Sequence, residues 1–368
     1  EYSAGLDSFL DVGPRRFVAV MTPEKCALAL RLAPEAFAEL RLCVFDECHL
    51  LSDPGRGVIV DLLLAQLFTA APQMNFLLMS AMISNPEELA GWLAAARGST
   101  AVESAIKWRP SRALRGMIGV NREIAQTNGN TALAELVLIQ QTQPHRVKRP
   151  FAAPLVMLAG LSGPWNSEAQ ADYRKSALPA EAGLAVERRQ GNVTINTQGW
   201  CNAATLAVSQ AIAQADIPVI AFVLQNRNWA FTMAADVTAP LRDPQTPLPP
   251  LVQAYLVIAE VELGVASELA ALFARGVAVH TSLMLPVEQA AAEFMFRGQH
   301  AKLMFATPTL AQGLNLPAVA VVIAGTNLGG GGWGQNGGEA HDERVKATIL
   351  NSFGRAGPPG VAHQGDGL

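Results

Sequence analysis

The chain is poor in charge and in cysteine. Only 16% of its 368 residues are charged, and 27 basic against 31 acidic residues give a net charge of -4. This balance excludes a broad basic field, so a nucleic-acid partner would have to be bound locally. The cysteines show no paired CxxC spacing, which favours reduced thiols over disulfides or zinc and predicts a cytoplasmic location. They are Cys26, Cys43, Cys48 and Cys201.

Residues 62–83 lack charged side chains and are numerous enough to span a membrane. Polar residues and a proline interrupt this run, at Gln66, Pro72, Gln73 and Asn75. The interruptions predict a helix over 61–69, a turn around Pro72 and a strand over 76–79 instead. No membrane partner is therefore expected.

The chain also lacks a signal peptide, and it begins with Glu1 rather than Met. This beginning predicts that the chain starts within a longer protein. The length leaves room for two or more domains, and a hydrophobic content of 50% predicts a large buried core. Composition indicates no particular protein partner.

Four apolar residues at 42–45 are followed by Asp46, Glu47 and, two positions later, His49. The apolar run predicts a buried parallel strand that is covered by helices on both faces. Ligands bind at the carboxyl ends of such strands, so Asp46 is predicted to hold Mg²⁺ and Glu47 to polarise a water against a phosphate. Two acids after an apolar run are common, and the alternative is that they only begin a polar loop.

Polar residues follow other apolar runs in the same way. A strand predicted over 17–21 precedes Thr22, and the strand predicted over 76–79 precedes Ser80. Since neighbouring parallel strands end at one edge of a sheet, the loop at Ser80 and the acidic loop are predicted to line one crevice. Thr22 offers a hydroxyl and backbone amides to a phosphate, and the alternative is an ordinary cap of a helix over 24–30.

The second half repeats this pattern. Apolar strands are predicted over 217–224, 277–282 and 302–307, each ending in polar residues and accompanied by a helical stretch. Repeated strand and helix units predict an α/β fold with a parallel, doubly wound sheet.

The middle of the chain, about 121–216, is less regular. It contains one apolar piece at 154–161 and a basic cluster, HRVKR, at 145–149. Such a cluster is usually a solvated face, and the alternative is that it lines a nucleic-acid path.

Five motifs resemble those of the superfamily 2 DExD/H-box helicases, in the same order along the chain. TPEK at 22–25, DECH at 46–49 and SA at 80–81 resemble motifs Ib, II and III. ATPTLAQGLNLPA at 306–318 and GRAG at 354–357 resemble motifs V and VI. Their form is similar to the branch that contains the Ski-type RNA helicases and the Hel-type DNA repair helicases. Five motifs in order are far more specific than any one alone.

The resemblance implies two RecA-like parallel-sheet domains, the first truncated at its N-terminus, in a chain that lacks the C-terminal domains of the family. Residues 1–106 would be part of the first domain and 217–368 the second. Residues 107–216 would form a crossover and an insertion, because KWRPSR at 107–112 resembles the basic crossover of this family.

The resemblance also implies a site for ATP and Mg²⁺. Asp46 would hold the metal, and Glu47 would activate the attacking water. Gly313 and Asn315 would lie near the ribose of the nucleotide. The alternative for Gly313 is an ordinary turn glycine, and for Asn315 it is a turn or helix-cap residue. Arg355 would reach the phosphates as an arginine finger does, a contribution of about 10³- to 10⁵-fold in rate.

Other residues would connect ATP hydrolysis to RNA or DNA. His49 and Ser80 would couple the nucleotide state to nucleic-acid binding. Thr22, Pro23 and Thr307 would contact the nucleic-acid backbone. The family resemblance thus implies an ATP-dependent helicase or translocase in the intact protein, which hydrolyses ATP with Mg²⁺ to remodel RNA or DNA.

The chain departs from the family pattern at several positions. Met82 replaces the Thr of motif III, Asn351 stands at the Gln position of motif VI, and Pro358 replaces its second Arg. The Gly-rich phosphate loop with Lys and Ser/Thr is absent, and the glycines at 329–332 lack its spacing, so they predict a surface loop. These departures favour an alternative, a degenerate helicase that serves as a nucleic-acid-binding or scaffold module without ATPase activity. A third hypothesis, a metalloenzyme built on the DECH residues, predicts tight metal binding without nucleotide.

Overall fold

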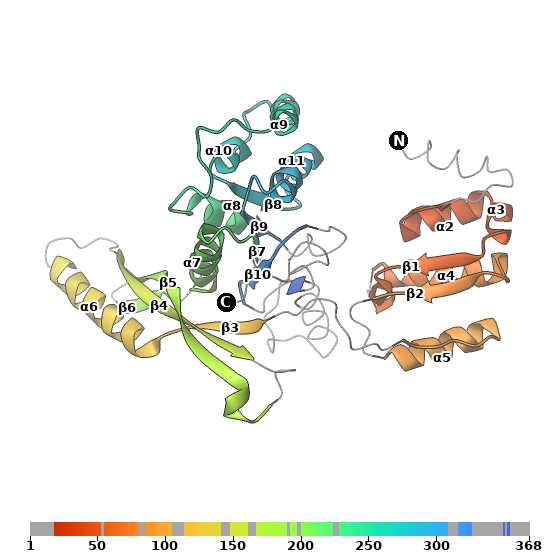
Figure 1. The fold of residues 1–368 in the computed structure, drawn as a ribbon, viewed down its shortest axis with the longest axis horizontal. Helices are drawn as coiled ribbons and strands as arrows, with labels where there is room; N and C mark the ends of the chain where they lie inside the picture. Colours follow the sequence, from red (N-terminus) through yellow and green to blue (C-terminus); the bar gives the residue numbers. More distant parts are fainter. Residues whose placement is uncertain are drawn as a thin grey trace. The chain divides into compact units, whose positions relative to one another are not determined.

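The structure is a computed structural model of the 368-residue chain, and it falls into two compact units, Glu1–Trp108 and Arg109–Leu368 (Figure 1). Each unit is described by itself. The residues described are 18–52, 55–80, 85–104, 114–140, 148–160, 167–189, 192–196, 200–223, 228–307, 316–325, 349 and 352–353.

The first unit contains a two-stranded parallel sheet, in which β1 (Leu42–Phe45) pairs with β2 (Asn75–Leu78). The other elements are α2 (Pro23–Leu32), α3 (Glu35–Ala38), the 3-10 helix η1 (Cys48–Ser52), α4 (Gly57–Ala70) and α5 (Pro86–Arg97). The strands predicted at 42–45 and 76–79 are confirmed, and so are the helices predicted at 24–30 and 61–69. The charge-free run is therefore a helix and a strand, as predicted.

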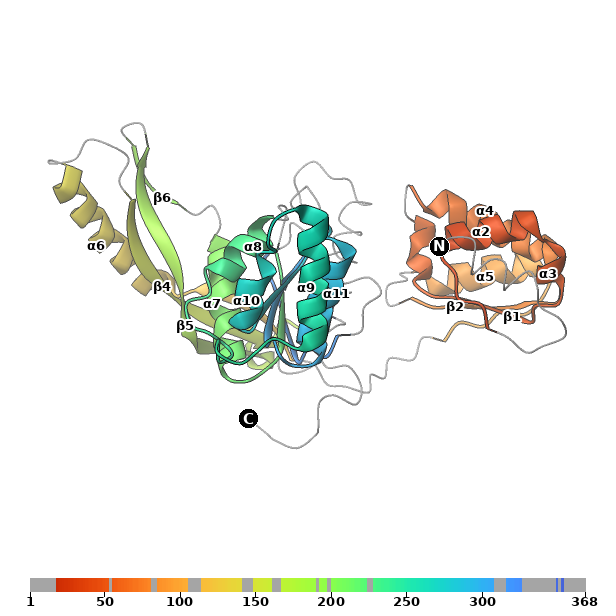
Figure 2. The same ribbon diagram turned by 90° about the horizontal axis from the view of Figure 1, so that it is seen from above.

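The burial predicted for β1 is wrong on one face of the sheet. Figure 2 shows the helices of the first unit on one side of β1 and β2. On the opposite face Leu42, Val44 and Leu77 are 57%, 50% and 47% exposed. Cys43 and Phe76 pack into the core of the unit. Because successive side chains of a strand point to opposite faces, helices on one side bury only every second residue.

The strand predicted over 17–21 is also wrong, at least for 18–21, which the structure describes. These residues are not in a strand, and Val18 and Val20 are 90% and 91% exposed. A strand needs a neighbour for its backbone hydrogen bonds, and within the described part of this unit the sheet consists of β1 and β2. The apolar composition of this segment therefore did not predict its secondary structure correctly.

Arg97, the last residue of α5, joins this helix to the rest of the first unit. Its guanidinium group donates hydrogen bonds to the carbonyl oxygens of Phe68, Pro72 and Met74, at 3.1, 2.6 and 2.9 Å. The same group lies 5.5 and 5.3 Å from the ring centroids of Phe68 and Phe76. These contacts hold the turn between α4 and β2, and therefore the start of β2.

The second unit is built around a parallel sheet with the strand order β10-β7-β9-β8. Its strands are β7 (Val219–Phe222), β8 (Val277–His280), β9 (Leu303–Ala306) and β10 (Ala320–Ile323). Every residue of β7, β8 and β9 is buried, as expected for parallel strands that are covered on both faces. The three strands predicted in this half and the parallel α/β fold are confirmed.

Five helices accompany this sheet in the part of the unit that the structure describes. They are α7 (Trp200–Gln214), α8 (Asn228–Ala235), α9 (Pro250–Leu263), α10 (Leu269–Ala274) and α11 (Pro286–Arg297). No helix among the described residues has the length and apolar character needed to cross a membrane.

An antiparallel sheet in the middle of the chain was not predicted. Its order is β3-β4-β5-β6, and α6 packs on it. The elements are β3 (Arg115–Val120), α6 (Arg122–Gln140), β4 (Lys148–Gly160), the 3-10 helix η2 (Gln170–Asp172), β5 (Tyr173–Arg189) and β6 (Asn192–Asn196). Pro150 and Pro154 lie within β4, and prolines usually argue against a central strand because they donate no hydrogen bond to the ladder. The pairing of β4 with β5 shifts its register beside Pro154.

The contacts of Arg97 lead to a test of stability. Arg97→Ala should lower the free energy of unfolding of the first unit by about 2 kcal/mol, because three carbonyl oxygens lose a charged donor. Chemical denaturation monitored by circular dichroism measures this change. Arg31→Ala, at an exposed position of α2, is the control and should change stability by less than about 0.5 kcal/mol. Equal effects of the two substitutions would contradict the role given to Arg97.

Candidate functional site

The ends of β1 and β2 are held together by backbone hydrogen bonds. The amide of Met79 donates to the carbonyl oxygen of Phe45, and the amide of Cys48 donates to the carbonyl oxygen of Met79, both at 2.9 Å. These bonds continue the pairing of the two strands past their ends. The acidic loop and the loop at Ser80 therefore meet, as the sequence predicted.

The chain turns sharply directly after Asp46. Glu47 has a φ of 56°, a left-handed conformation that is uncommon for a residue with a side chain. The Asp46 carboxylate supports this turn, because its Oδ1 accepts a hydrogen bond from the Glu47 amide at 2.9 Å. Such strained backbone persists where its surroundings hold it, and it is often found at functional sites.

Glu47, His49 and Ser80 form one polar cluster. The Nδ1 atom of His49 lies 3.3 Å from Oε2 of Glu47 and 3.3 Å from Oγ of Ser80. The imidazole thus lies between a residue of the acidic loop and a residue that follows β2. A change at either partner can reach the other through one ring nitrogen, which either donates or accepts according to its tautomer.

Asp46 is suited to hold a hard cation such as Mg²⁺. Its side chain is exposed at the end of β1, and carboxylate oxygens are the ligands that Mg²⁺ prefers. Among the described residues, no three His, Cys, Asp or Glu side chains form a group that could hold a metal ion by themselves. The metalloenzyme hypothesis therefore gains no support from this part of the chain, whereas a single carboxylate fits a cation shared with phosphates.

Two cysteines of the first unit have thiols whose pKa is raised by burial. All four cysteines of the chain are free, and Cys48 is buried. Burial raises the pKa of Cys48 and that of Cys26 to about 11. Both thiols are therefore protonated at neutral pH.

The segment after DECH is anchored by a close approach and an ion pair. A Cβ atom at Gly57 would lie 2.5 Å from the carbonyl oxygen of Leu51, so only glycine fits where η1 meets α4. Arg56, just before α4, forms an ion pair of 2.8 Å with Glu24 of α2. These contacts fix the path of the chain from the acidic loop into α4.

Thr22 caps α2, which confirms the helix cap that was the alternative to a phosphate contact. Its Oγ1 accepts a hydrogen bond from the Lys25 amide at 3.3 Å, and Pro23 occupies the start of the helix. The Thr22 side chain is exposed. The contact of Thr22 and Pro23 with nucleic acid stays a prediction.

In the second unit, Thr307 lies at the carboxyl end of β9. Its amide donates to the carbonyl oxygen of His280, at the end of β8, at 3.1 Å. Thr307 is only 7% exposed. Its predicted contact with a nucleic-acid phosphate stays a prediction.

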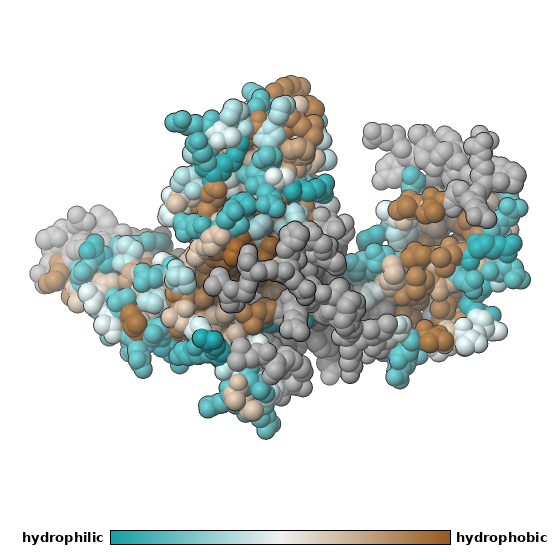
Figure 3. Space-filling model, in the orientation of Figure 1, coloured by the Kyte–Doolittle hydropathy of each residue, from teal (hydrophilic) through white to brown (hydrophobic). Residues whose placement is uncertain are grey.

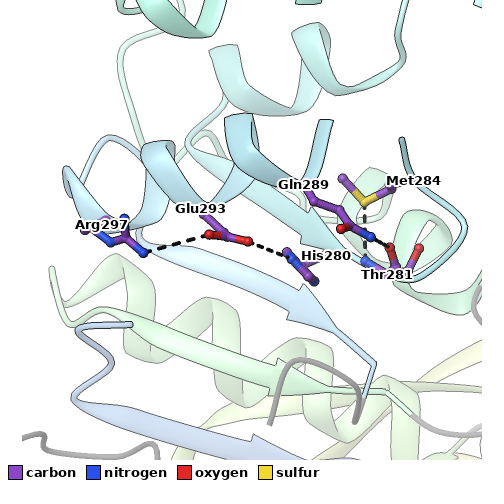
Figure 4. Close-up of polar contacts among 6 residues, drawn as sticks. All are labelled: His280, Thr281, Met284, Gln289, Glu293 and Arg297. Atoms are coloured by element: carbon purple, nitrogen blue, oxygen red, sulfur yellow. Dashed lines mark hydrogen bonds and ion pairs between the residues drawn. The ribbon is translucent and has the colours of Figure 1, made fainter. Parts of the chain in front are cut away.

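A set of polar contacts ties α11 to the end of β8 (Figure 4). Nε2 of His280 lies 3.2 Å from Oε1 of Glu293, and Glu293 lies 3.8 Å from Arg297. Gln289 donates to the carbonyl oxygen of Thr281 at 2.9 Å. Burial lowers the pKa of His280, and Glu293 offsets part of this effect.

Sequence reasoning did not single out His280 or Glu293. His280 closes an apolar strand, and the rule that ligands gather at the carboxyl ends of strands could have drawn attention to it. Glu293 lies on the following helix and gave no local signal. Their pairing depends on the packing of α11 against β8.

Several predicted site residues lie outside the described residues. They are Gly313, Asn315 and Arg355, and their roles stay predictions. The same holds for Met82 and Pro358, the departures from motifs III and VI.

Comparisons with known proteins agree with the motifs. The DEAD/DEAH box helicase family matches residues 15–89, which contain TPEK, DECH and SA. The chain is 26% identical over 355 residues to the ATP-dependent DNA helicase Hel308 of Methanococcus vannielii. It is 22% identical over 338 residues to the DExH-box ATP-dependent RNA helicase DExH9 of Arabidopsis thaliana. Within these comparisons the chain is similar to DEAD/DEAH box and DExH-box helicases.

The chain spans well under half the length of these superfamily 2 relatives. The Hel308 match covers 95% of this chain and 37% of the relative, and the DExH9 match covers 86% and 30%. The structure of the Mycobacterium smegmatis helicase Lhr bound to ssDNA and AMP-PNP is 14% identical, with a TM-score of 0.45, and covers 91% of this chain and 29% of that one. A TM-score this low adds no argument about the fold.

The cap at Thr22 can be tested separately from any phosphate contact. Thr22→Ala should lower the free energy of unfolding of the first unit by about 1 kcal/mol, because the first turn of α2 loses its acceptor. Thr22→Ser keeps a hydroxyl and should stay within a few tenths of a kcal/mol of the wild type. Denaturant titration followed by circular dichroism measures both variants. If Thr22→Ser lowered the free energy of unfolding as much as Thr22→Ala does, the capping role of the Thr22 hydroxyl would be contradicted.

His280 should make the stability of the second unit depend on pH. Because its folded pKa lies below the ordinary value of 6.5, folding favours the neutral ring, and stability should fall as the pH drops through and below this value. His280→Asn should reduce the loss of stability between about pH 7.5 and about pH 5.5. Thermal denaturation across this range measures the effect. An unchanged slope in His280→Asn would refute the assignment.

Proposed function

We propose that this chain is part of the core of an ATP-dependent nucleic-acid helicase or translocase. The observation that supports it most is the meeting of Glu47, His49 and Ser80 at the ends of two adjacent parallel strands. This cluster joins the DECH and SA motifs in space. Such a contact would give events at a bound nucleotide a direct physical route to a nucleic-acid strand.

The proposed chemistry is the hydrolysis of ATP. Asp46 would hold a Mg²⁺ ion, which would supply neutralising charge on the phosphates. Glu47 would orient a water and accept its proton as the water oxygen bonds to the terminal phosphorus, while the bond to the bridging oxygen breaks and ADP and phosphate form. The His49 ring, 3.3 Å from Glu47 Oε2, would fix the orientation of this carboxylate.

The same ring would connect hydrolysis with nucleic-acid binding. Nδ1 of His49 also lies 3.3 Å from Ser80 Oγ, so a proton or a change of orientation at Glu47 alters the hydrogen bond available to Ser80. Ser80 begins the loop that would sense the nucleic acid. This arrangement would convert a nucleotide cycle into movement of the bound strand.

Nucleic acid would be held through its backbone. Thr22 and Pro23 at the start of α2, and Thr307 at the end of β9, would contact phosphates, and Gly313, Asn315 and Arg355 keep their proposed places at the nucleotide. Backbone contacts contain no base information, and relatives of the chain include a DNA helicase and an RNA helicase by name, so the proposal covers both polymers. The free thiols favour a cytoplasmic location.

Substitution of Glu47 tests the proposal. In the native protein that contains this sequence, Glu47→Gln should lower the rate of nucleic-acid-stimulated ATP hydrolysis by about 10²-fold or more, because the amide cannot accept a proton. Phosphate release in the presence of Mg²⁺ measures the rate. Binding of a labelled single-stranded oligonucleotide should change little.

Glu39→Gln, an exposed acid of the same unit, is the matched control and should keep the wild-type rate. Wild-type turnover by Glu47→Gln would overturn the role of this carboxylate. A native protein that binds oligonucleotides but hydrolyses no ATP would instead establish the degenerate binding or scaffold module, which Met82 and Pro358 favour.

A further inference from the structure

Strand β8 lies at the edge of the sheet in the second unit. In the strand order β10-β7-β9-β8, it has β9 on one side and no neighbouring strand on the other among the described residues. The end of an edge strand is held by one ladder of backbone hydrogen bonds, so its position depends on what else packs against it. Helix α11 packs on β8 and supplies polar side chains at this point.

One peptide group at the end of β8, between His280 and Thr281, receives Thr307. Its carbonyl oxygen accepts a hydrogen bond from the Thr307 amide at 3.1 Å, and its N–H group donates to Sδ of Met284 at 3.3 Å. His280 pairs with Ala306 in the ladder, so this bond extends the pairing of β8 and β9 by one residue. A shift of this peptide group would therefore displace the Thr307 backbone.

Two side chains of α11 hold the residues that share this peptide group (Figure 4). Oε1 of Glu293 lies 3.2 Å from Nε2 of His280, and the side-chain amide of Gln289 donates to the carbonyl oxygen of Thr281 at 2.9 Å. Gln289 and Glu293 are four residues apart and lie on one face of the helix. We call these two side chains the α11 clamp. Because His280 and Thr281 are buried, water competes little for these bonds.

The His280 ring has one proton to donate at neutral pH. Burial lowers its pKa, so the ring is neutral there. A carboxylate accepts hydrogen bonds and does not donate them, so Glu293 fixes the ring proton on Nε2. Nδ1 is buried and has no hydrogen-bond partner within the described part of the chain. Removal of the Glu293 carboxylate would deprive this buried ring of its side-chain partner and allow it to rotate.

The clamp is only weakly tied to the surface. Glu293 also lies 3.8 Å from Arg297, whose side chain is 59% exposed, and an ion pair in such a place contributes about 0–1 kcal/mol. Figure 3 shows a mixed surface around α11, with hydrophilic residues next to hydrophobic ones. The stronger contacts of the clamp are the inward ones, to the end of β8.

We propose that Gln289 and Glu293 are positioning residues for Thr307. Through the peptide group between His280 and Thr281, they set the place of the Thr307 backbone and hence of its hydroxyl. They thereby raise the affinity for single-stranded nucleic acid without touching it. This inference rests on the proposed function, in which Thr307 contacts a phosphate. A binding group has to be held within about 0.5 Å of its productive place, and such supporting contacts provide this precision.

The test measures the Kd of the native protein that contains this sequence for a fluorescently labelled single-stranded oligonucleotide, by fluorescence anisotropy. Both oligo(dT) and oligo(U) are used. Glu293→Ala and Gln289→Ala should each raise the Kd about fivefold, because each removes one hydrogen bond of the clamp. Glu293→Gln keeps an oxygen that accepts from Nε2 of His280 and should stay within about twofold of the wild type. Glu260→Ala, with the same loss of charge at an exposed position of α9, is the matched control and should also stay within about twofold.

A double-mutant cycle separates positioning from a general loss of structure. Thr307→Val removes the hydroxyl but keeps the backbone amide and the shape of the side chain, and it should raise the Kd about tenfold. Glu293→Ala combined with Thr307→Val should raise the Kd no further than Thr307→Val alone, because the clamp acts through Thr307. A general loss of structure would add to the effect instead. Circular dichroism spectra should be the same for all variants.

The outcomes distinguish the clamp from the proposed function. Wild-type binding by Thr307→Val would overturn the phosphate contact of the proposed function, and the clamp with it. If Thr307→Val weakens binding while both clamp variants bind as the wild type does, the phosphate contact stands and the clamp is wrong. Additive losses in the double variant, or a failure of Glu293→Gln to keep binding, would also contradict the positioning role.

Discussion

The candidate site depends on two backbone hydrogen bonds that continue the pairing of β1 and β2 past the ends of the strands. The amide of Met79 bonds to Phe45 and the amide of Cys48 bonds to Met79, so the chain after each strand has a defined position relative to the other. Without these bonds the DECH residues and Ser80 would belong to two independent loops. With them, one ring nitrogen of His49 is shared between a carboxylate and a hydroxyl. The strained turn at Glu47 is maintained by the same frame.

The two units hold their strands in different ways. In the second unit, β7, β8 and β9 are buried throughout, so hydrophobic burial on both faces fixes the sheet and leaves polar residues only at its ends. In the first unit the sheet has helices on one side, and local polar contacts have a larger share in fixing it. Arg97 on three carbonyl oxygens and Arg56 with Glu24 are examples. Hydrophobic burial thus holds the sheet of the second unit, whereas specific polar contacts contribute more to holding the sheet of the first unit.

The pair of His280 and Glu293 beside the sheet of the second unit is created by packing, and no local sequence pattern indicates it. His280 ends β8, and its ring meets Glu293 only because α11 folds back over that strand. Its Nδ1 atom is buried and finds no hydrogen-bond partner among the residues that the structure describes.

The sequence by itself determined the α/β class, the strands that end at Asp46, Ser80 and Thr307, and the helicase motifs, because apolar runs and short polar motifs are local patterns. It misjudged residues 18–21 and the burial of Leu42 and Val44, since both depend on which elements lie next to a strand. It also missed the antiparallel sheet, whose strands contain prolines and pair across long separations. Only the tertiary structure decided that Glu47, His49 and Ser80 share one contact, because parallel pairing joins residues that are far apart in the chain.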